Sequence, residues 1–182
     1  MTKVPEPIAI DFETRAIGRR PTYPPVPVGV SVIEPGRPPV YWAWGHPTGN
    51  TVTRADAARR LKALYRSGAP LVFHHGKFDI DVGETHLGLP RLPWDRYHDT
   101  LFLAFLHDPH SPDLRLKPLA ERHLKIPSTE RDRVRDWVWA NIPEAKKKKS
   151  DWGAYISACP GGLVAPYAIG DTRRTYPLFR KL

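Results

Sequence analysis

Two acidic residues at the end of a predicted strand are the first that could do chemistry. Asp11 and Glu13 close the mostly apolar run IAIDFET at residues 8–14. Side chains alternate across a strand, so both carboxylates lie on one face and repel each other. A divalent cation, which prefers oxygen ligands, would relieve that repulsion. The pattern therefore predicts a metal site, although a strand that merely ends in polar residues would have the same sequence.

Further acids follow at two other places in the chain. Asp79 lies shortly after the apolar run at residues 71–73, and Asp171 lies in a predicted helix. Tyr167 precedes Asp171 by four residues, so a helix would present its hydroxyl and the carboxylate on the same face. Acidic side chains thus recur at three structurally sensible positions, one of them with a phenol beside it.

The hydrophobic pattern predicts the strands and helices that must position these side chains. Expected strands cover residues 8–14, 26–33, 40–44 and 71–73, the first three as an antiparallel meander. Expected helices cover residues 53–66, about 74–86, 99–106, 117–124 and 130–141. A last helix begins near Val164, and Pro177 should kink or end it. This order predicts an α/β fold with a mixed sheet.

Length, charge and cysteine content limit the class of protein. The 182 residues suffice for a single domain, predicted to cover residues 1–182. No signal peptide and no membrane-spanning run is evident, so no membrane partner is expected. The single cysteine, Cys159, excludes an internal disulfide and a Cys-rich zinc site. It is compatible with a reducing cytoplasm, so a cytoplasmic location is expected, or the host cytoplasm if a phage encodes the chain. The net charge of +9 favours a polyanion such as nucleic acid as partner.

Three motifs resemble those of the DEDD superfamily of 3′–5′ exonucleases, which is named for four acids. They are IAIDFET at residues 8–14, HHGKFD at 74–79 and YAIGD at 167–171. One subgroup has His five residues before the last Asp, where this chain has Pro166. The other has Tyr four residues before it, as Tyr167 is here, so the chain resembles the tyrosine subgroup.

The likeness extends over about residues 6–180 to the proofreading exonuclease domain of family A DNA polymerases. Asp99-Thr100-Leu101 and the run LAERHL at residues 119–124 contribute to it. The resemblance implies a ribonuclease-H-like fold, with a mixed sheet of roughly five strands flanked by helices. It also implies hydrolysis of phosphodiester bonds from the 3′ end, with release of nucleoside 5′-monophosphates.

The resemblance further implies two divalent metal ions, Mg²⁺ or Mn²⁺, and a role for each acid. Asp11 would bridge both ions, and Glu13 and Asp171 would complete the site that activates water. Asp79 would act mainly through water or the second metal. Tyr167 would orient the attacking water, because a phenol with an ordinary pKa near 10 is a poor base at neutral pH.

Substrate contacts are expected on both sides of the acids. Thr14 would lie near the terminal 3′-hydroxyl, and Ile17 would wedge between the last bases, although ordinary packing is an equal alternative for Ile17. His74 and His75 would approach backbone phosphates. His75 stands where the family usually has Asn, which leaves the surroundings of the metal site in question because imidazole titrates near neutrality.

Residues 127–163 are predicted to be an insertion rich in basic and aromatic side chains. Lys146 and Lys147 belong to a run of four lysines that would contact phosphates, the alternative being a solvated loop. Trp137 and Trp152 are expected to pin the segment to the core rather than to stack on bases.

The preferred substrate is single-stranded DNA or a DNA 3′ end, because the likeness is to polymerase proofreading domains. A separate DNA polymerase is then a candidate partner. Trimming of RNA 3′ ends is the alternative within enzymes, since ribonuclease D also has the tyrosine motif. A nucleic-acid-binding module that keeps the fold without catalysis is the alternative outside enzymes.

Overall fold

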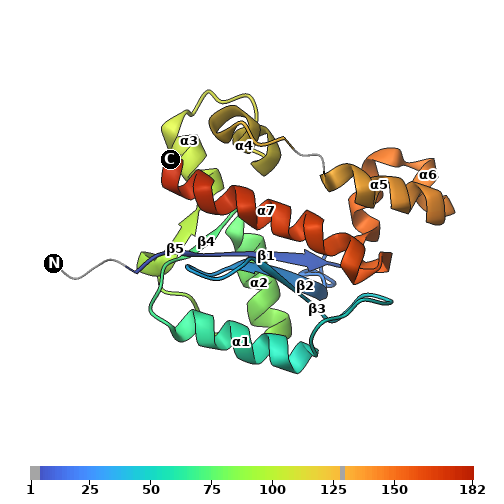
Figure 1. The fold of residues 1–182 in the computed structure, drawn as a ribbon, viewed down its shortest axis with the longest axis horizontal. Coiled ribbons are helices and arrows are strands. Elements are labelled where there is room, and N and C mark those ends of the chain that lie inside the picture. Colours follow the sequence, from blue (N-terminus) through green and yellow to red (C-terminus); the bar gives the residue numbers. More distant parts are fainter. Residues whose placement is uncertain (1–4, 128–129) are drawn as a thin grey trace.

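A mixed sheet with the strand order β3-β2-β1-β4-β5 organises the computed structural model, which describes residues 5–127 and 130–182. Residues 1–4 of the predicted domain and 128–129 of the predicted insertion lie outside the described residues. The central strand β1 (Ile8–Thr14) pairs antiparallel with β2 (Pro27–Ile33) and parallel with β4 (Leu71–Phe73). Helix α7 (Gly161–Lys181) crosses one face, and α1 (Arg54–Arg66) and α2 (Gly76–Leu87) cover the other (Figure 1). The predicted α/β fold with five strands is confirmed.

The edges of the sheet are the short strands β3 (Val40–Ala43) and β5 (Tyr97–Asp99). Strand β3 completes the predicted antiparallel meander with β1 and β2. Strand β5 pairs in parallel with β4, so that Asp99 stands opposite Phe73. The sequence pattern did not locate β5, because three residues are too few to reveal an alternation of apolar and polar side chains.

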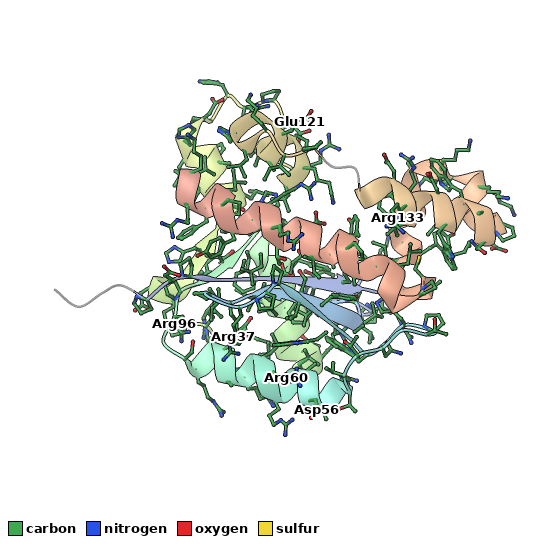
Figure 2. The ribbon with its side chains drawn as sticks, in the orientation of Figure 1. Arg37, Asp56, Arg60, Arg96, Glu121 and Arg133 are labelled. Atoms are coloured by element: carbon green, nitrogen blue, oxygen red, sulfur yellow. The ribbon has the colours of Figure 1, made fainter. Side chains whose placement is uncertain are left out.

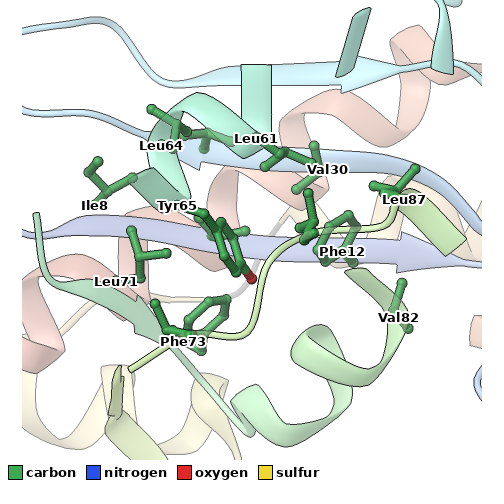
Figure 3. Close-up of a cluster of buried hydrophobic side chains, with 14 of the residues drawn as sticks. Ile8, Phe12, Val30, Leu61, Leu64, Tyr65, Leu71, Phe73, Val82 and Leu87 are labelled. Atoms are coloured by element: carbon green, nitrogen blue, oxygen red, sulfur yellow. The ribbon is translucent and has the colours of Figure 1, made fainter. Parts of the chain in front are cut away.

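Alternation along β1 divides its side chains between two layers. Ile8, Ile10 and Phe12 pack with α1 and α2 in a cluster of buried side chains (Figure 3). Leu61 and Tyr65 come to this cluster from α1. The Thr53 hydroxyl caps this helix by accepting from the Asp56 amide at 3.0 Å. The opposite face of β1 carries the acids and meets α7.

The remaining elements lie on the α7 side of the sheet or at its edge (Figure 1). They are the 3₁₀ helix η1 (Trp94–Arg96), α3 (Thr100–His107), α4 (Leu116–Leu124), α5 (Glu130–Asn141), α6 (Pro143–Lys147) and the 3₁₀ helix η2 (Lys149–Ala158). The helices predicted at 99–106, 117–124 and 130–141 are therefore confirmed. Among the described residues, no helix is both long and apolar enough to cross a membrane.

Helix α7 departs most from the sequence prediction. It begins at Gly161, three residues before the expected start, and continues past Pro177 to Lys181. Leu178, directly after Pro177, is fully buried against Leu119 of α4 and Ala104 of α3. Of the two effects predicted for Pro177, a kink or an end of the helix, the end does not occur, because the burial of Leu178 outweighs the loss of one backbone hydrogen bond.

The segment from α5 to η2 packs on a second core that it shares with β3 and α7. Val134, Val138 and Ile156 are buried there, and Trp137 and Trp152 are partly buried against them, as predicted. Arg133 on α5 is exposed, as Figure 2 shows.

Candidate active site

Three of the predicted acids meet where β1 passes beneath α7. One carboxylate oxygen from each of Asp11, Glu13 and Asp171 lies within 4.8 Å of the others. Glu13 and Asp171 are buried, and Asp11 is half-buried. The strand alternation predicted for Asp11 and Glu13 thus directs both side chains at the helix that carries Asp171.

A serine on β2 fixes the position of α7 over these acids. Ser31 stands opposite Asp11 in the β1–β2 ladder. Its hydroxyl donates to the Ala168 carbonyl at 2.8 Å and lies 3.1 Å from the Thr172 hydroxyl. Sequence reasoning missed Ser31; a serine within the apolar run PVGVSVI was the available signal, but its meaning depends on the strand register.

Asp79 reaches the site from the other side of the strand. Its Oδ1 accepts from the Phe12 amide at 2.9 Å, and the side chain is buried. Strand β4 pairs with β1 at Ile8 and Ala9. The Asp79 carboxylate therefore binds a β1 amide, that of Phe12, which lies beyond the part of β1 paired with β4. Among the described residues, Asp79 lies outside the group of three carboxylates, and the structure gives it first of all a role in holding β1.

Burial and mutual repulsion disfavour the charged forms of these three carboxylates unless a cation lies among them. Burial, followed by Asp171, raises the pKa of Asp11 to about 8. Burial, Asp11 and Asp171 raise the pKa of Glu13 well above its ordinary range. A set made only of carboxylate oxygens suits a hard divalent cation such as Mg²⁺ or Mn²⁺. The residues present therefore fit the predicted kind of ion.

A lysine that sequence reasoning missed stands among these acids. The Lys117 ammonium lies 2.7 Å from Oδ1 and 2.9 Å from Oδ2 of Asp171. It also lies 4.2 Å from the centroid of the Tyr167 ring. Lys117 is in the first turn of α4, where a positive charge opposes the helix dipole. That unfavourable placement was the signal in the sequence that this lysine has another partner.

Tyr167 is oriented by contacts on two sides. Its ring meets the Trp152 ring edge to face, with centroids 5.9 Å apart and planes at 87°. Burial, the Asp171 charge and a hydrogen bond to Asp171 raise the pKa of Tyr167 well above 10. The phenol is therefore protonated at neutral pH and acts as a hydrogen-bond donor, in agreement with the predicted one-turn spacing to Asp171.

A pocket of about 420 Å³ opens beside Glu13. Thr14, the last residue of β1, and Ile17, shortly after it, line one side. Ser150, Asp151 and neighbouring residues of η2 line the opposite side. Ile17 is 68% exposed, which argues against ordinary packing as its role. The Thr14 hydroxyl donates to the Arg15 carbonyl at 2.8 Å.

The two histidines of the second motif differ in their surroundings. The His74 Nδ1 lies 2.8 Å from the Thr100 hydroxyl, and burial lowers the pKa of His74 to about 4. His74 is half-buried, and its contact with a backbone phosphate stays a prediction. His75 is exposed and has left-handed backbone angles, φ 63° and ψ 42°. Asn and His both adopt this conformation more readily than most residues. The backbone conformation thus explains why the position accepts either the Asn that is usual in the family or the His of this chain.

The predicted phosphate-binding lysines lie farther along the η2 side. Lys146 and Lys147 are exposed at the end of α6 and do not line the pocket beside Glu13. Lys148 pairs with Asp151 at 2.6 Å, and Lys149 lies 5.6 Å from the ring centroid of Trp139. The lysine run thus forms an exposed basic surface near one wall of the pocket.

The fold and the carboxylate group define the class of protein as a nuclease of the ribonuclease-H-like type. A family model described as 3′–5′ exonuclease, that of the exonuclease domain of family A DNA polymerases, matches residues 2–182. The chain belongs to this family and is a 3′–5′ exonuclease that acts on nucleic acid. Membership confirms the resemblance drawn from the motifs and sets aside the non-catalytic binding module.

Solved structures share the fold at low sequence identity. A structure titled "apo form of the nuclease" has a TM-score of 0.61 and 21% identity over 97% of this chain and 70% of its own. The Pan2 catalytic unit of Neurospora crassa has a TM-score of 0.56 and 18% identity over 99% of this chain. The Saccharomyces cerevisiae Pan2 pseudoubiquitin hydrolase–RNA exonuclease module, in complex with A7 RNA, has 0.55 and 16% over 98%. This chain spans 28% of each Pan2 chain. No curated protein sequence matches significantly.

Proposed function

We propose that the protein removes nucleotides one at a time from the 3′ end of single-stranded DNA, releasing nucleoside 5′-monophosphates. The observation that carries this proposal is the convergence of oxygens from Asp11, Glu13 and Asp171 within 4.8 Å, next to a pocket open to solvent. A phosphodiester entering that pocket would bring its scissile phosphate against the carboxylates. The reaction is hydrolysis and requires no other co-reactant than water.

The acids would hold two divalent ions, Mg²⁺ or Mn²⁺, with Asp11, Glu13 and Asp171 as ligands. When bound, such ions would lower the pKa of a water and stabilise charge on the phosphoryl and leaving oxygens. Asp79 holds the strand between the first two acids through the Phe12 amide, and is proposed to contact the second ion or its water. Tyr167, protonated and braced by Trp152, would donate a hydrogen bond to the attacking water.

The terminal nucleotide would occupy the pocket beside Glu13. Ile17 is exposed at the pocket and would insert against the last base, while Thr14 lines the same pocket and would meet the 3′-hydroxyl. His75, exposed at the start of α2, would approach a backbone phosphate, as would His74 beside it. A separate DNA polymerase remains a proposed partner.

RNA is the second candidate substrate. The Saccharomyces cerevisiae Pan2 module of the same fold is titled an RNA exonuclease and was solved with RNA. The choice of DNA rests on the family match to polymerase exonuclease domains. The two substrates differ at the 2′-hydroxyl, which the walls of the pocket would have to accept or exclude.

The test is digestion of 5′-labelled single strands, one of DNA and one of the matching RNA, with Mg²⁺, with Mn²⁺ or with EDTA. A ladder that shortens from the 3′ end, faster on DNA and absent in EDTA, is expected. A faster ladder on RNA would favour the second candidate. A ladder that persists in EDTA, or none with either metal, would contradict the proposal.

Lys146 and Lys147 are proposed to bind backbone phosphates. Replacing both by Ala should weaken binding to single-stranded DNA and make the binding constant less dependent on salt. The slope of log K against log salt concentration should become shallower by about 0.7 for each phosphate that is no longer neutralised. Fluorescence anisotropy over a series of salt concentrations measures this slope. Lys62 and Arg66, on α1 at the opposite face of the sheet, provide a matched double control. An unchanged slope in the lysine variant would exclude the phosphate-binding role.

A further inference from the structure

We propose that Lys117 is a built-in cation that occupies Asp171 in the absence of metal and must leave it when a metal ion binds. The lysine would thereby keep the carboxylate group assembled while weakening its affinity for the ion. The inference rests on the proposed metal-dependent function, and it concerns a residue outside the acids and the tyrosine of the motifs.

The contact geometry is that of a replacement for a metal ion. The ammonium lies 2.7 and 2.9 Å from the two oxygens of Asp171, so it engages both sides of that carboxylate. Asp171 also contributes an oxygen to the group of three within 4.8 Å. The carboxylate cannot give the same oxygens fully to an ammonium and to a metal ion, so the two cations compete.

The charge of Lys117 acts on the whole group. Its positive charge attracts Asp11 and Glu13 as well as Asp171, which partly offsets the burial of these acids and their mutual repulsion. The Lys117 side chain is only 16% exposed, so water screens this interaction weakly. Without the lysine, the metal-free site would gather buried carboxylates with less compensation.

A second cation nearby is fixed in place, which identifies Lys117 as the one that can move. The Arg174 guanidinium lies 3.9 Å from Asp171 Oδ1, but it is 2% exposed and donates to the Gly170 carbonyl at 2.9 Å and to the Pro127 carbonyl. Those bonds tie Arg174 to the backbone. Lys117 has a flexible stem, and it also lies over the face of the Tyr167 ring, which an ammonium leaves at small cost.

The backbone of Lys117 stays in position whichever cation is bound. Helix α4 is anchored on α7 by Leu119, which is buried against Leu178. The exchange therefore needs rotation of one side chain and no movement of a helix. Replacing the charge by a neutral side chain of similar length should leave the fold intact.

The test is calorimetric titration of Mn²⁺ into metal-free protein, without nucleic acid. Lys117→Met should bind Mn²⁺ at least about tenfold more tightly than the unmodified chain, because the competing charge is gone. Lys117→Gln serves as a second neutral variant should the methionine protein not fold. Lys117→Arg keeps the charge and should bind no more tightly than the unmodified chain.

The matched control is Lys181→Met, which removes the same charge from an exposed site on α7, ten residues or about 15 Å along the helix from Asp171. Its affinity for Mn²⁺ should stay within about threefold of the unmodified chain. Equal affinity of the neutral Lys117 variants and the unmodified chain would overturn this proposal and leave the metal site standing. Tighter binding by Lys117→Arg would overturn it too. Absence of Mn²⁺ binding by every protein would overturn the metal site and the proposal together.

Discussion

Replacing Asp11 by Asn is expected to slow the removal of 3′ nucleotides by at least about 10³-fold, since it removes a charged ligand where phosphoryl charge must be stabilised. Asparagine has nearly the shape of aspartate, so the sheet and α7 should keep their positions. Gel analysis of the 5′-labelled ladder in Mg²⁺ and in Mn²⁺ measures the loss.

The same substitution should raise the stability of the metal-free protein. The pKa of Asp11 is raised from 3.8 to about 8 by burial and by Asp171, so the unfolded chain releases a proton that the folded chain retains. The folded state therefore loses stability as the pH rises from about 4 to about 8, and Asn removes that loss. Urea denaturation in EDTA at pH 7 should show a larger free energy of unfolding for Asp11→Asn.

The opposite signs of the two effects make the test specific. A residue that only supports the fold would lose activity and stability together. Asp95→Asn is the matched control, because Asp95 is an exposed aspartate on η1, and both measurements should match the unmodified chain. Retention of more than about a tenth of the rate by Asp11→Asn would remove Asp11 from the proposed site.

The parts of this site that could be predicted from the sequence are those set by local periodicity. Alternation along a strand places Asp11 beside Glu13, and the helical repeat places Tyr167 over Asp171. Both rules involve residues two to four positions apart and hold wherever the element forms. The motifs then predicted that these two pairs belong to one site, because the motifs occur in the same order as in a known family.

The parts that could not be predicted depend on contacts between distant elements. Ser31 is 137 positions from Ala168, and Lys117 is 54 positions from Asp171. Each contact follows from strand register or from the packing of one helix on another, which no local pattern contains. The continuation of α7 past Pro177 has the same origin, because burial of Leu178 keeps the helix in a conformation that the local rule disfavours.

Replacing Asp99 by Ala is expected to lower the free energy of unfolding by about 3 kcal/mol or more, the largest loss of stability that a single polar side chain should cause here. Asp99 is 4% exposed and accepts four hydrogen bonds. Its Oδ1 accepts from the amides of His75 and Leu101, both at 2.9 Å. Its Oδ2 accepts from the Gly76 amide and the Tyr97 hydroxyl, both at 2.8 Å. Alanine would leave the buried Gly76 amide and the three part-buried donors without this acceptor.

The role of Asp99 extends beyond the N-cap of α3. It caps α3 through Leu101 and also holds the first residues of α2, where His75 has its left-handed backbone conformation. Helix α2 carries Asp79, whose bond to the Phe12 amide fixes β1 between the first two acids. Loss of Asp99 should therefore loosen the metal site indirectly, and lower the affinity for Mn²⁺ as well as the stability.

Urea denaturation and Mn²⁺ titration together test this chain of contacts. Asp99→Asn keeps one acceptor oxygen and should fall between the alanine variant and the unmodified chain in stability. Asp95→Ala, on the exposed η1, is the control and should change the free energy of unfolding by less than about 0.5 kcal/mol. If the free energy of unfolding of Asp99→Ala fell by less than about 1 kcal/mol, water would have to replace the carboxylate as acceptor. That result would contradict the proposal that Asp99 on β5 supports the acids of β1 through α2.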